Sequence, residues 1–285
     1  MSIVLCAPEA VETTRDMPTA PDVADTEAVV VSNTAVNSDY YHLILHAGGP
    51  ALKAQAGQFF NIACPATSKD LPFLRRPMSA YGVDPLAGRI EFLYKVSGAG
   101  TRGLATLREG NALPILGPLG IGFRLDPAWR HIVVVGRGVG LATLAPLAEM
   151  AAARNVGISV ILSARSREMV MSVERFRNAK AHVEIVIDDD GSSDPLNVER
   201  ILLGLVESQN VGAFFTCGSN RLMLLLKRMS AELKIPGQVA MEQQMACGLG
   251  MCFCCVRSFR GEAGTEQRRV CVEGPVFSLE EALSW

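Results

Sequence analysis

Three features are missing from this sequence, and each absence excludes a class of protein. The 285 residues carry a formal net charge of only −2, which gives no general attraction to nucleic acid or to an anionic membrane. The first 20 residues lack the basic region and apolar run of a secretory signal. The longest apolar stretch, residues 132–153, contains Arg137 and Glu149, whose charges a membrane span would bury at high cost. We therefore expect a cytoplasmic protein with neither a nucleic-acid nor a membrane partner.

Cysteine, by contrast, is concentrated near the C-terminus. Cys247, Cys252, Cys255 and Cys271 read C-x4-C-x2-C-x15-C. A disulfide is disfavoured because thiols stay reduced in the cytoplasm. Structural zinc usually takes two short cysteine pairs that are far apart in the chain, whereas here three cysteines share one loop and the fourth comes later. The spacing favours a [2Fe–2S] cluster, with these four as metal ligands, over zinc or a chance cluster.

The residues around these ligands support the same interpretation. Gly248 and Gly250 allow the positive φ angles and the close backbone N–H groups that a loop around a cluster requires. Cys254 does not fit the ligand spacing, and we expect it to be a buried thiol that binds no metal. The remaining cysteines are scattered, and we expect them to be inert small hydrophobic residues.

The pattern of apolar residues predicts a multidomain fold with α+β and α/β parts. Residues 1–26 are rich in Ala, Pro, Thr and acidic residues and are predicted to be a disordered tail. Residues 27–126 contain short β-rich segments separated by turn residues, which is typical of an antiparallel β-barrel or sandwich. Residues 127–236 alternate strands with helices, which predicts a doubly wound parallel sheet. Residues 237–285 would form a small C-terminal cluster domain.

A glycine-rich turn joins the first strand of the α/β region to its first helix. The turn reads G-R-G-V-G, with glycines at Gly136, Gly138 and Gly140. A phosphate can bind to free backbone N–H groups at such a helix N-terminus. Taken alone, the pattern also fits a tight turn with no ligand.

A second candidate motif lies in the β-rich region. The segment "LRRPMSAY" places Arg76 and Ser79 at the end of a strand, and "LYKVSGAGT" follows with Gly100 and Thr101. Arginine can pair with a pyrophosphate, and a hydroxyl or backbone N–H group can reach a flavin ring nitrogen. From these residues alone, a simple turn with a surface arginine pair remains an alternative.

Seven segments, taken in order, resemble a known family: "RRPMS", "LYKVSGAGT", "LGPLGIGF", "VVVGRGVGLA", "CGS", "EQQMACGLGMCFCCV" and "VCVEGPVF". The family is the electron-transfer subunits of two-subunit, NAD-dependent dihydroorotate dehydrogenases, within the ferredoxin–NADP reductase superfamily. The resemblance covers about residues 27–280. It implies that NAD(P)H exchanges electrons with FAD, and that FAD exchanges them through the [2Fe–2S] cluster with a separate catalytic protein, in a hetero-oligomer.

The resemblance also assigns residues to these cofactors. It implies FAD contacts at Arg76, Pro77, Met78, Ser79, Leu93, Tyr94, Lys95, Gly100 and Thr101. The nicotinamide nucleotide would bind at Gly136, Gly138 and Gly140, with Cys217 and Gly218 beside the nicotinamide. Ser79 and Cys217 are thereby the candidate catalytic residues, which revises the inert interpretation of Cys217.

Two residues depart from the family pattern in the glycine turn. Arg137 stands where the family has a glycine, and Thr143 stands where it has a proline. Arg137 would either clasp a nucleotide phosphate or block the pocket. If it blocks the pocket, the alternative function is a non-catalytic redox sensor or adaptor with an impaired NAD site. A zinc-stabilised binding module is a third hypothesis, and the partner could also be an oxygenase or another reductase-dependent enzyme.

The choice between NADH and NADPH depends on a segment after the second α/β strand. Arg165 and Arg167 lie where the adenosine ribose is expected, and they could pair with the 2′-phosphate of NADPH. Arginines in such a loop are also often only solvated, and the resembling family uses NAD. We therefore expect NADH to be preferred.

Overall fold

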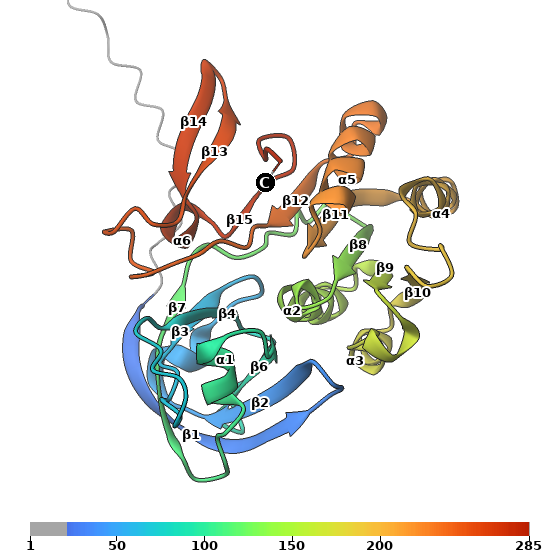
Figure 1. The fold of residues 1–285 in the computed structure, drawn as a ribbon. Helices are drawn as coiled ribbons and strands as arrows, with labels where there is room; N and C mark the ends of the chain where they lie inside the picture. Colours follow the sequence, from blue (N-terminus) through green and yellow to red (C-terminus); the bar gives the residue numbers. More distant parts are fainter. Residues whose placement is uncertain (1–21, 285) are drawn as a thin grey trace, which may run out of the picture.

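A computed structural model describes residues 22–284. These residues form two sheets and a C-terminal hairpin (Figure 1). The strands are β1 (Ala24–Ala35), β2 (Tyr40–His46), β3 (Phe59–Ile62), β4 (Arg76–Ser79), β5 (Gly82–Asp84), β6 (Arg89–Lys95), β7 (Ala112–Leu119), β8 (His131–Arg137), β9 (Gly157–Ala164), β10 (His182–Ile187), β11 (Val211–Cys217), β12 (Gly237–Ala240), β13 (Val256–Gly261), β14 (Gly264–Arg269) and β15 (Val276–Ser278). The helices are α1 (Ala99–Leu104), α2 (Gly140–Ala153), α3 (Val173–Asn178), α4 (Pro195–Ser208), α5 (Asn220–Leu233) and α6 (Val270–Glu273), with short 3₁₀ helices at Gly49–Lys53 and Arg167–Met169. Within this part of the chain, no helix is both long and apolar enough to cross a membrane.

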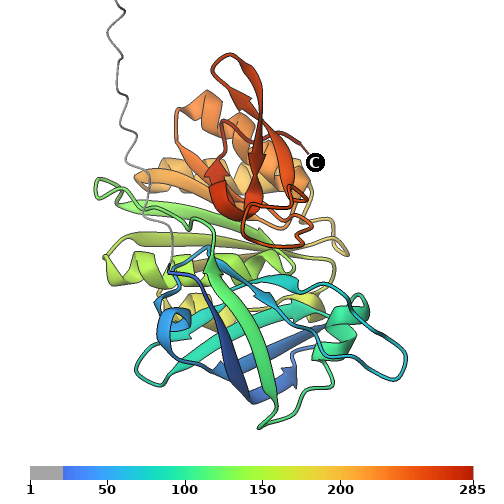
Figure 2. The same ribbon diagram turned by 90° about the vertical axis from the view of Figure 1, so that its left-hand side faces the viewer.

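The N-terminal sheet is antiparallel, and its seven strands follow the order β4-β3-β7-β1-β2-β6-β5. It curls into an open barrel in the lower part of the molecule (Figure 2). Side chains of strand β2 alternate between the interior and the outer face of the barrel. Leu43 and Leu45 point inward and are fully buried, whereas His42 and Ile44 are only partly buried. The barrel that the sequence predicts is confirmed.

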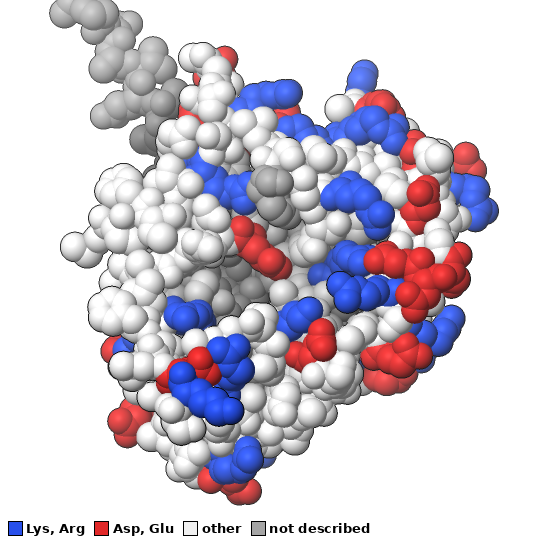
Figure 3. Space-filling model, viewed as in Figure 1, with Lys and Arg blue, Asp and Glu red and all other residues white. Residues whose placement is uncertain are grey.

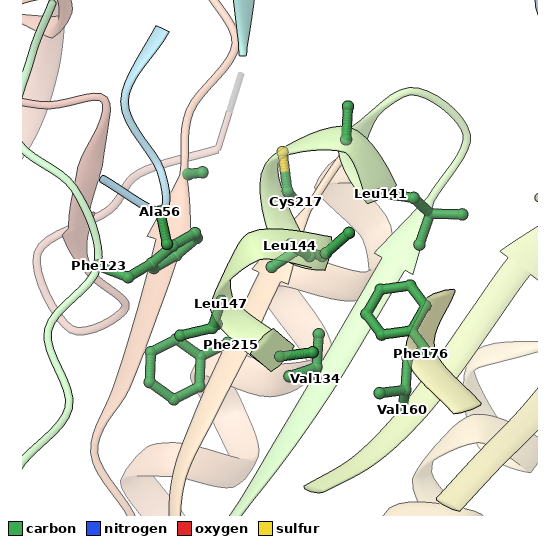
Figure 4. Close-up of a cluster of buried hydrophobic side chains, with 14 of the residues drawn as sticks. Ala56, Phe123, Val134, Leu141, Leu144, Leu147, Val160, Phe176, Phe215 and Cys217 are labelled. Atoms are coloured by element: carbon green, nitrogen blue, oxygen red, sulfur yellow. The ribbon is translucent and has the colours of Figure 1, made fainter. Parts of the chain in front are cut away.

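The second sheet has six strands in the order β10-β9-β8-β11-β12-β15, and all neighbours but the last pair are parallel. Its central strand β8 is buried on both faces, as its unbroken apolar sequence predicts. Ile132 and Val134 pack with α2 and α3, while Val133 and Val135 pack with α4 and α5. Figure 4 shows α2 side chains lying over this sheet. The doubly wound architecture is confirmed.

The boundaries differ from those that the sequence suggests. Strand β1 begins at Ala24, inside the predicted tail, because Ala24 and Asp25 already pair with β7; residues 1–21 lie outside the described part. Strands β12 and β15 both fall within 237–285, yet they belong to the parallel-sheet domain. The cysteine segment and the β13–β14 hairpin are therefore an excursion between two adjacent sheet strands.

An ion-pair network joins the barrel to the α/β domain. Arg175 of α3 contacts Glu91 of β6 at 2.8 Å and Glu149 of α2 at 2.7 Å. His42 lies 3.0 Å from the same Glu91 carboxylate. The guanidinium also stacks 4.1 Å above the Tyr81 ring. These contacts fix α3 against the outside of the barrel.

Candidate functional site

A cleft of about 800 Å³ lies where the barrel, the α/β domain and the cysteine loop meet; we use "cysteine loop" for residues 247–255. Figure 3 shows this face of the molecule hollowed near its centre. The predicted residues that line the cleft are Arg76, Pro77, Met78, Ser79, Leu93, Tyr94, Lys95, Thr101 and Cys217. The structure thus brings most of the predicted flavin motif and Cys217 to one cavity between the two domains. The predicted glycines Gly100, Gly136, Gly138, Gly140 and Gly218 do not line it, and the glycine turn reaches it through Val139.

The barrel side of the cleft supplies one cation, Arg76, that has no carboxylate partner among the residues that the structure describes. Arg75 pairs with both oxygens of Asp25, at 2.8 and 2.9 Å. Arg76, the next residue, donates to the carbonyls of Leu74 and Arg75 and makes no ion pair within residues 22–284. Gly100 packs directly against it, because a Cβ there would lie 2.9 Å from Arg76 Nε. Gly100 therefore gives Arg76 its place in the cleft.

Three other predicted FAD contacts have their polar ends engaged by the protein itself. The Thr101 hydroxyl accepts hydrogen bonds from the backbone N–H groups of Ser97 and Gly98, at 2.9 and 3.1 Å. The Tyr94 hydroxyl donates to Asn33 inside the barrel, at 3.0 Å. Lys95 pairs with Asp39 at 3.1 Å. We therefore expect these residues to shape the cleft rather than to bind through those groups.

Ser79 and Cys217 come together through a third residue. Ser79 Oγ lies 2.7 Å from Thr143 Oγ1, and Cys217 Sγ lies 3.8 Å from the same hydroxyl. The three side chains come from β4, α2 and β11. Burial raises the pKa of Cys217 far above its ordinary value, so its thiol stays protonated at neutral pH. Thr143, noted only as a departure from the family pattern, thus links the two candidate catalytic residues.

The predicted nicotinamide turn is built by close backbone contacts. A Cβ on Gly140 would lie 2.6 Å from the carbonyl carbon and oxygen of Cys217, so only glycine lets α2 begin against β11. Gly218 has a φ of +88°, and a Cβ there would meet the Arg137 carbonyl. Gly138 also has a positive φ, of +55°. The glycine turn after β8 and the turn at Gly218 after β11 therefore pack on each other at the carboxyl end of the sheet, beside the cleft.

Arg137 is bound by protein groups at the ends of neighbouring strands. Its guanidinium makes a two-point ion pair with Asp188, at 3.0 and 2.5 Å, and donates to Ser163 Oγ at 2.8 Å. The hydrogen bond from Arg137 lowers the pKa of Asp188. Arg137 does not line the cleft. Its side chain ties the end of β8 to the end of β9 and to the loop after β10, and it leaves the cleft open.

The four predicted ligand cysteines form two pairs. The Cys252 side chain helps to lower the pKa of Cys247, and the Cys255 side chain raises the pKa of Cys271, so the thiols influence each other in these two pairs. Within residues 22–284, no three His, Cys, Asp or Glu side chains converge on one point suited to a single metal ion. Two pairs of thiols suit a two-iron cluster, in which each iron takes two thiolates.

Backbone N–H groups point at these sulfur atoms. Leu249 N lies 3.3 Å from Cys247 Sγ, and Cys271 N lies 3.4 Å from Cys255 Sγ. Burial raises the pKa of Cys247, but backbone donors in the loop outweigh it and lower that pKa to about 7. Burial and the neighbouring Cys255 raise the pKa of Cys271 to about 12. Gly248 and Gly250 have φ angles of +73° and +79°, as expected from the sequence. The donor set therefore fits a [2Fe–2S] cluster.

Cys254 is exposed, so the prediction that it is buried is wrong. It lies on the tip of the cysteine loop and lines the cleft. It is exposed because the loop turns there, with Phe253 at a positive φ of +56°. Residues 241–245, which follow β12, line the same cleft. Sequence reasoning assigned them no contact, although "EQQ" lies shortly before Cys247. Partial desolvation in the cleft raises the pKa of Glu242 in that segment.

Solved structures of two reductases share this fold. The structure of NADH-dependent reduced ferredoxin–NADP oxidoreductase has a TM-score of 0.74 and 24% identity, and the match covers 89% of this chain and 88% of that one. The ferredoxin reductase of carbazole 1,9a-dioxygenase has a TM-score of 0.61 and 21% identity, over 76% and 67% of the chains. At these identities the likeness shows the fold alone. The chain therefore has a ferredoxin reductase-like fold.

Similarity in sequence narrows this class to one family. The electron transfer subunit of dihydroorotate dehydrogenase B (NAD(+)) from Caldanaerobacter subterraneus subsp. tengcongensis is 32% identical over 259 residues, which are 90% of this chain and 98% of the relative. The same subunit from Desulforamulus reducens is 30% identical over 255 residues, or 90% and 96%. Residues 242–283 match the iron–sulfur cluster binding domain of dihydroorotate dehydrogenase B. The chain belongs to the family of dihydroorotate dehydrogenase B electron transfer subunits, which confirms the resemblance seen in the sequence.

Proposed function

We propose that this protein passes electrons between NAD(P)H and a separate catalytic subunit, by way of FAD in the cleft and a [2Fe–2S] cluster in the cysteine loop. One observation carries the proposal. Cys254, which stands between the ligands Cys252 and Cys255, lines the same cleft as Arg76 and Cys217. A cofactor in that cleft would therefore contact the barrel, the nicotinamide turn and the cluster loop together.

The chain's own residues would bind and orient the flavin. Arg76 supplies a positive charge for the pyrophosphate, and charge-assisted hydrogen bonds of this kind are stronger than neutral ones. The Ser79 and Thr143 hydroxyls, 2.7 Å apart, give a hydrogen-bonding pair at the wall of the cleft. Cys217 is 2% exposed and keeps water from the space beside them. When bound, FAD supplies the conversion between a two-electron hydride and single electrons.

The four cysteines would hold the cluster in two pairs, Cys247 with Cys252 and Cys255 with Cys271. The loop's backbone N–H groups stabilise the thiolates, as they do around metal-bound sulfur generally.

The domains that follow from the topology are a barrel up to about residue 126, a parallel-sheet domain that includes β12 and β15, and the cluster excursion between these two strands.

The cysteine loop exposes three large apolar side chains, which suits a protein partner. Met251, Phe253 and Leu249 are 79%, 62% and 44% exposed. Solvent-exposed side chains of this size on one loop are typical of a protein-binding surface. Because the named relatives are subunits of dihydroorotate dehydrogenase B, we propose that the partner is a dihydroorotate dehydrogenase-type catalytic subunit. We expect a hetero-oligomer.

The alternative of a redox sensor with an impaired NAD site loses its basis. It depended on Arg137 blocking the pocket, and Arg137 is held by Asp188 outside the cleft. We propose NADH as the preferred nucleotide. The cytoplasmic location stays a prediction.

Two measurements test the proposed function. The purified protein should contain FAD, iron and acid-labile sulfide, and its visible spectrum should bleach on anaerobic addition of NADH. Mixed with the catalytic subunit of a dihydroorotate dehydrogenase from the same organism, it should form a stable complex that reduces NAD⁺ with dihydroorotate. A protein that binds flavin and cluster but is not bleached by NADH would contradict the proposal.

A further inference from the structure

Asn61 carries a buried carboxamide for which the protein provides no partner. The residue is 0% exposed. Neither Nδ2 nor Oδ1 makes a hydrogen bond within residues 22–284, and the only other such buried side-chain atom there is Thr216 Oγ1. Burying an amide without a hydrogen bond is costly. A group outside the chain is therefore the expected partner.

The position of Asn61 on its strand directs it toward the cluster loop. Alternate residues of β3 point to opposite faces. Phe60 and Ile62 pack inside the barrel, so Asn61 and Phe59 lie on its outer face. Phe59 lines the cleft but Asn61 does not, which places Asn61 beyond the cleft wall.

One residue of the cysteine loop that lies close to Asn61 is Gly248, which is next to a predicted ligand. A Cβ added to Gly248 would lie 2.5 Å from Asn61 Nδ2. Gly248 follows Cys247 and has a φ of +73°, so glycine both makes the turn and lets the loop pass over the amide. The unpartnered amide nitrogen thus lies beneath the loop that would enclose the cluster.

We propose that Asn61 is a positioning residue that donates a hydrogen bond from Nδ2 to a sulfur atom of the [2Fe–2S] group. This rests on the proposed function, since it requires a cluster in the cysteine loop. Hydrogen bonds to the sulfurs are among the factors that set the potential of such clusters. The donor stabilises the reduced cluster, which carries one more negative charge, and so raises the reduction potential. A barrel residue would thereby tune a centre held by another domain.

The test is an EPR-monitored redox titration of the cluster in the flavin-loaded protein. Asn61→Leu keeps the approximate shape and removes the donor. We expect its cluster to be about tenfold harder to reduce at a given potential, which for one electron is a shift of ~59 mV to lower potential. Thr216→Val is the matched control, because it also removes a buried unpartnered polar atom, between Val135 and Val239 of the parallel sheet. Its cluster should have the wild-type potential.

The cluster-free proteins give a second measurement that does not require the cluster to assemble. Without a cluster the Asn61 amide has no partner, so Asn61→Leu should unfold at a temperature at least as high as the cluster-free wild type. A merely structural Asn61 would instead make the variant less stable, and that result would overturn the proposal. Asn61→Asp, which keeps the shape but lacks the donor, should also lower the potential.

The outcomes separate this inference from the function on which it rests. Wild-type protein without iron or sulfide would contradict the proposed function. A wild-type cluster whose potential is unchanged in both Asn61→Leu and Asn61→Asp would overturn only the role of Asn61.

Discussion

At the scale of single residues, neighbours in one motif have different environments. Arg75 and Arg76 are adjacent, yet within residues 22–284 only Arg75 has a carboxylate partner, Asp25. In the sequence the two arginines look equivalent. They differ in ion pairing because the fold brings Asp25, 50 positions away, to Arg75. The same holds for Ser79 and Cys217, which meet only through Thr143. The types of residue in the site could be predicted, but these pairings depend on contacts that no local pattern encodes.

Arg76→Ala should weaken FAD binding. The substitution removes the one cleft cation that lacks an ion pair in the described residues, and a charge-assisted contact is worth about 1.5–3 kcal/mol, or roughly 10- to 100-fold in Kd. Flavin content and FAD titration by fluorescence measure this. Arg102→Ala, which removes a surface ion pair with Asp70, is the control and should bind FAD normally. Undiminished FAD affinity in Arg76→Ala would show that the pyrophosphate lies elsewhere.

Serine substitution of Cys247, Cys252, Cys255 or Cys271 should abolish the cluster and spare FAD, because the flavin contacts come mainly from the barrel. Iron and flavin analyses of each variant measure both. NADH oxidation with a dye that accepts electrons from flavin should survive, and reduction of the protein partner should fail. Cys254→Ala should keep its iron. If Cys254→Ala loses the iron and Cys255→Ala keeps it, the ligand assignment is wrong.

At the scale of elements, long apolar strands were predictable and short edge strands were not. β8 has an unbroken apolar run, and β9 is apolar except for Ser159 and Ser163, so the parallel sheet follows from sequence. β12 and β15 have four and three residues, too few to show a period, and their place in the sheet depends on pairing with β11 and with each other. This is why the predicted boundary at residue 237 divides a sheet that is continuous.

The ends of β9 and β10 should favour NADH over NADPH. Arg137, a cation at this edge of the sheet, is held by Asp188, so it is not available to a 2′-phosphate. Arg165 follows β9 and is exposed. We expect kcat/KM for NADH to exceed that for NADPH by about tenfold or more, equivalent to about 1.4 kcal/mol. Arg165→Ala should leave this ratio unchanged, as should Arg177→Ala on α3. A preference for NADPH that disappears in Arg165→Ala would reverse the assignment.

At the scale of the whole molecule, the cleft exists only because two domains are fixed against each other. The His42, Glu91, Arg175 and Glu149 network joins them on the outside of the barrel. Gly82 makes room for it, since a Cβ there would lie 2.3 Å from Arg175. His42 lies on β2, and its partner Glu91 lies on the neighbouring strand β6. Such contacts between domains are beyond sequence reasoning.

Glu91→Gln should loosen this interface in a pH-dependent manner. The hydrogen bond from His42, together with Arg175, outweighs burial and lowers the pKa of Glu91 from 4.5 to about 2. The folded state therefore binds this proton less tightly than the unfolded state, so the stabilisation is complete above pH 4.5 and is lost as the pH falls toward 2. It amounts to at most about 3 kcal/mol.

Urea unfolding at several pH values measures this effect. The midpoint of Glu91→Gln should lie below that of the wild type from pH 7 to pH 5, and the gap should narrow at lower pH. Glu174→Gln is the control on α3, because Glu174 is 77% exposed in a surface pair with Arg177 and should contribute less than about 1 kcal/mol. Equal midpoints for Glu91→Gln and the wild type at pH 7 would show that the network does not hold the domains together.

The central claim is that one chain joins a nicotinamide site, a flavin and an iron–sulfur cluster into a single electron path. An anaerobic titration of the purified protein with NADH, followed by visible absorption and by EPR, tests it most directly. The account predicts that the flavin absorption falls and that the EPR signal of a reduced [2Fe–2S] cluster grows as NADH is added, with the flavin change alone persisting in Cys255→Ser. A flavin that is fully reduced beside a cluster that stays oxidised would contradict it.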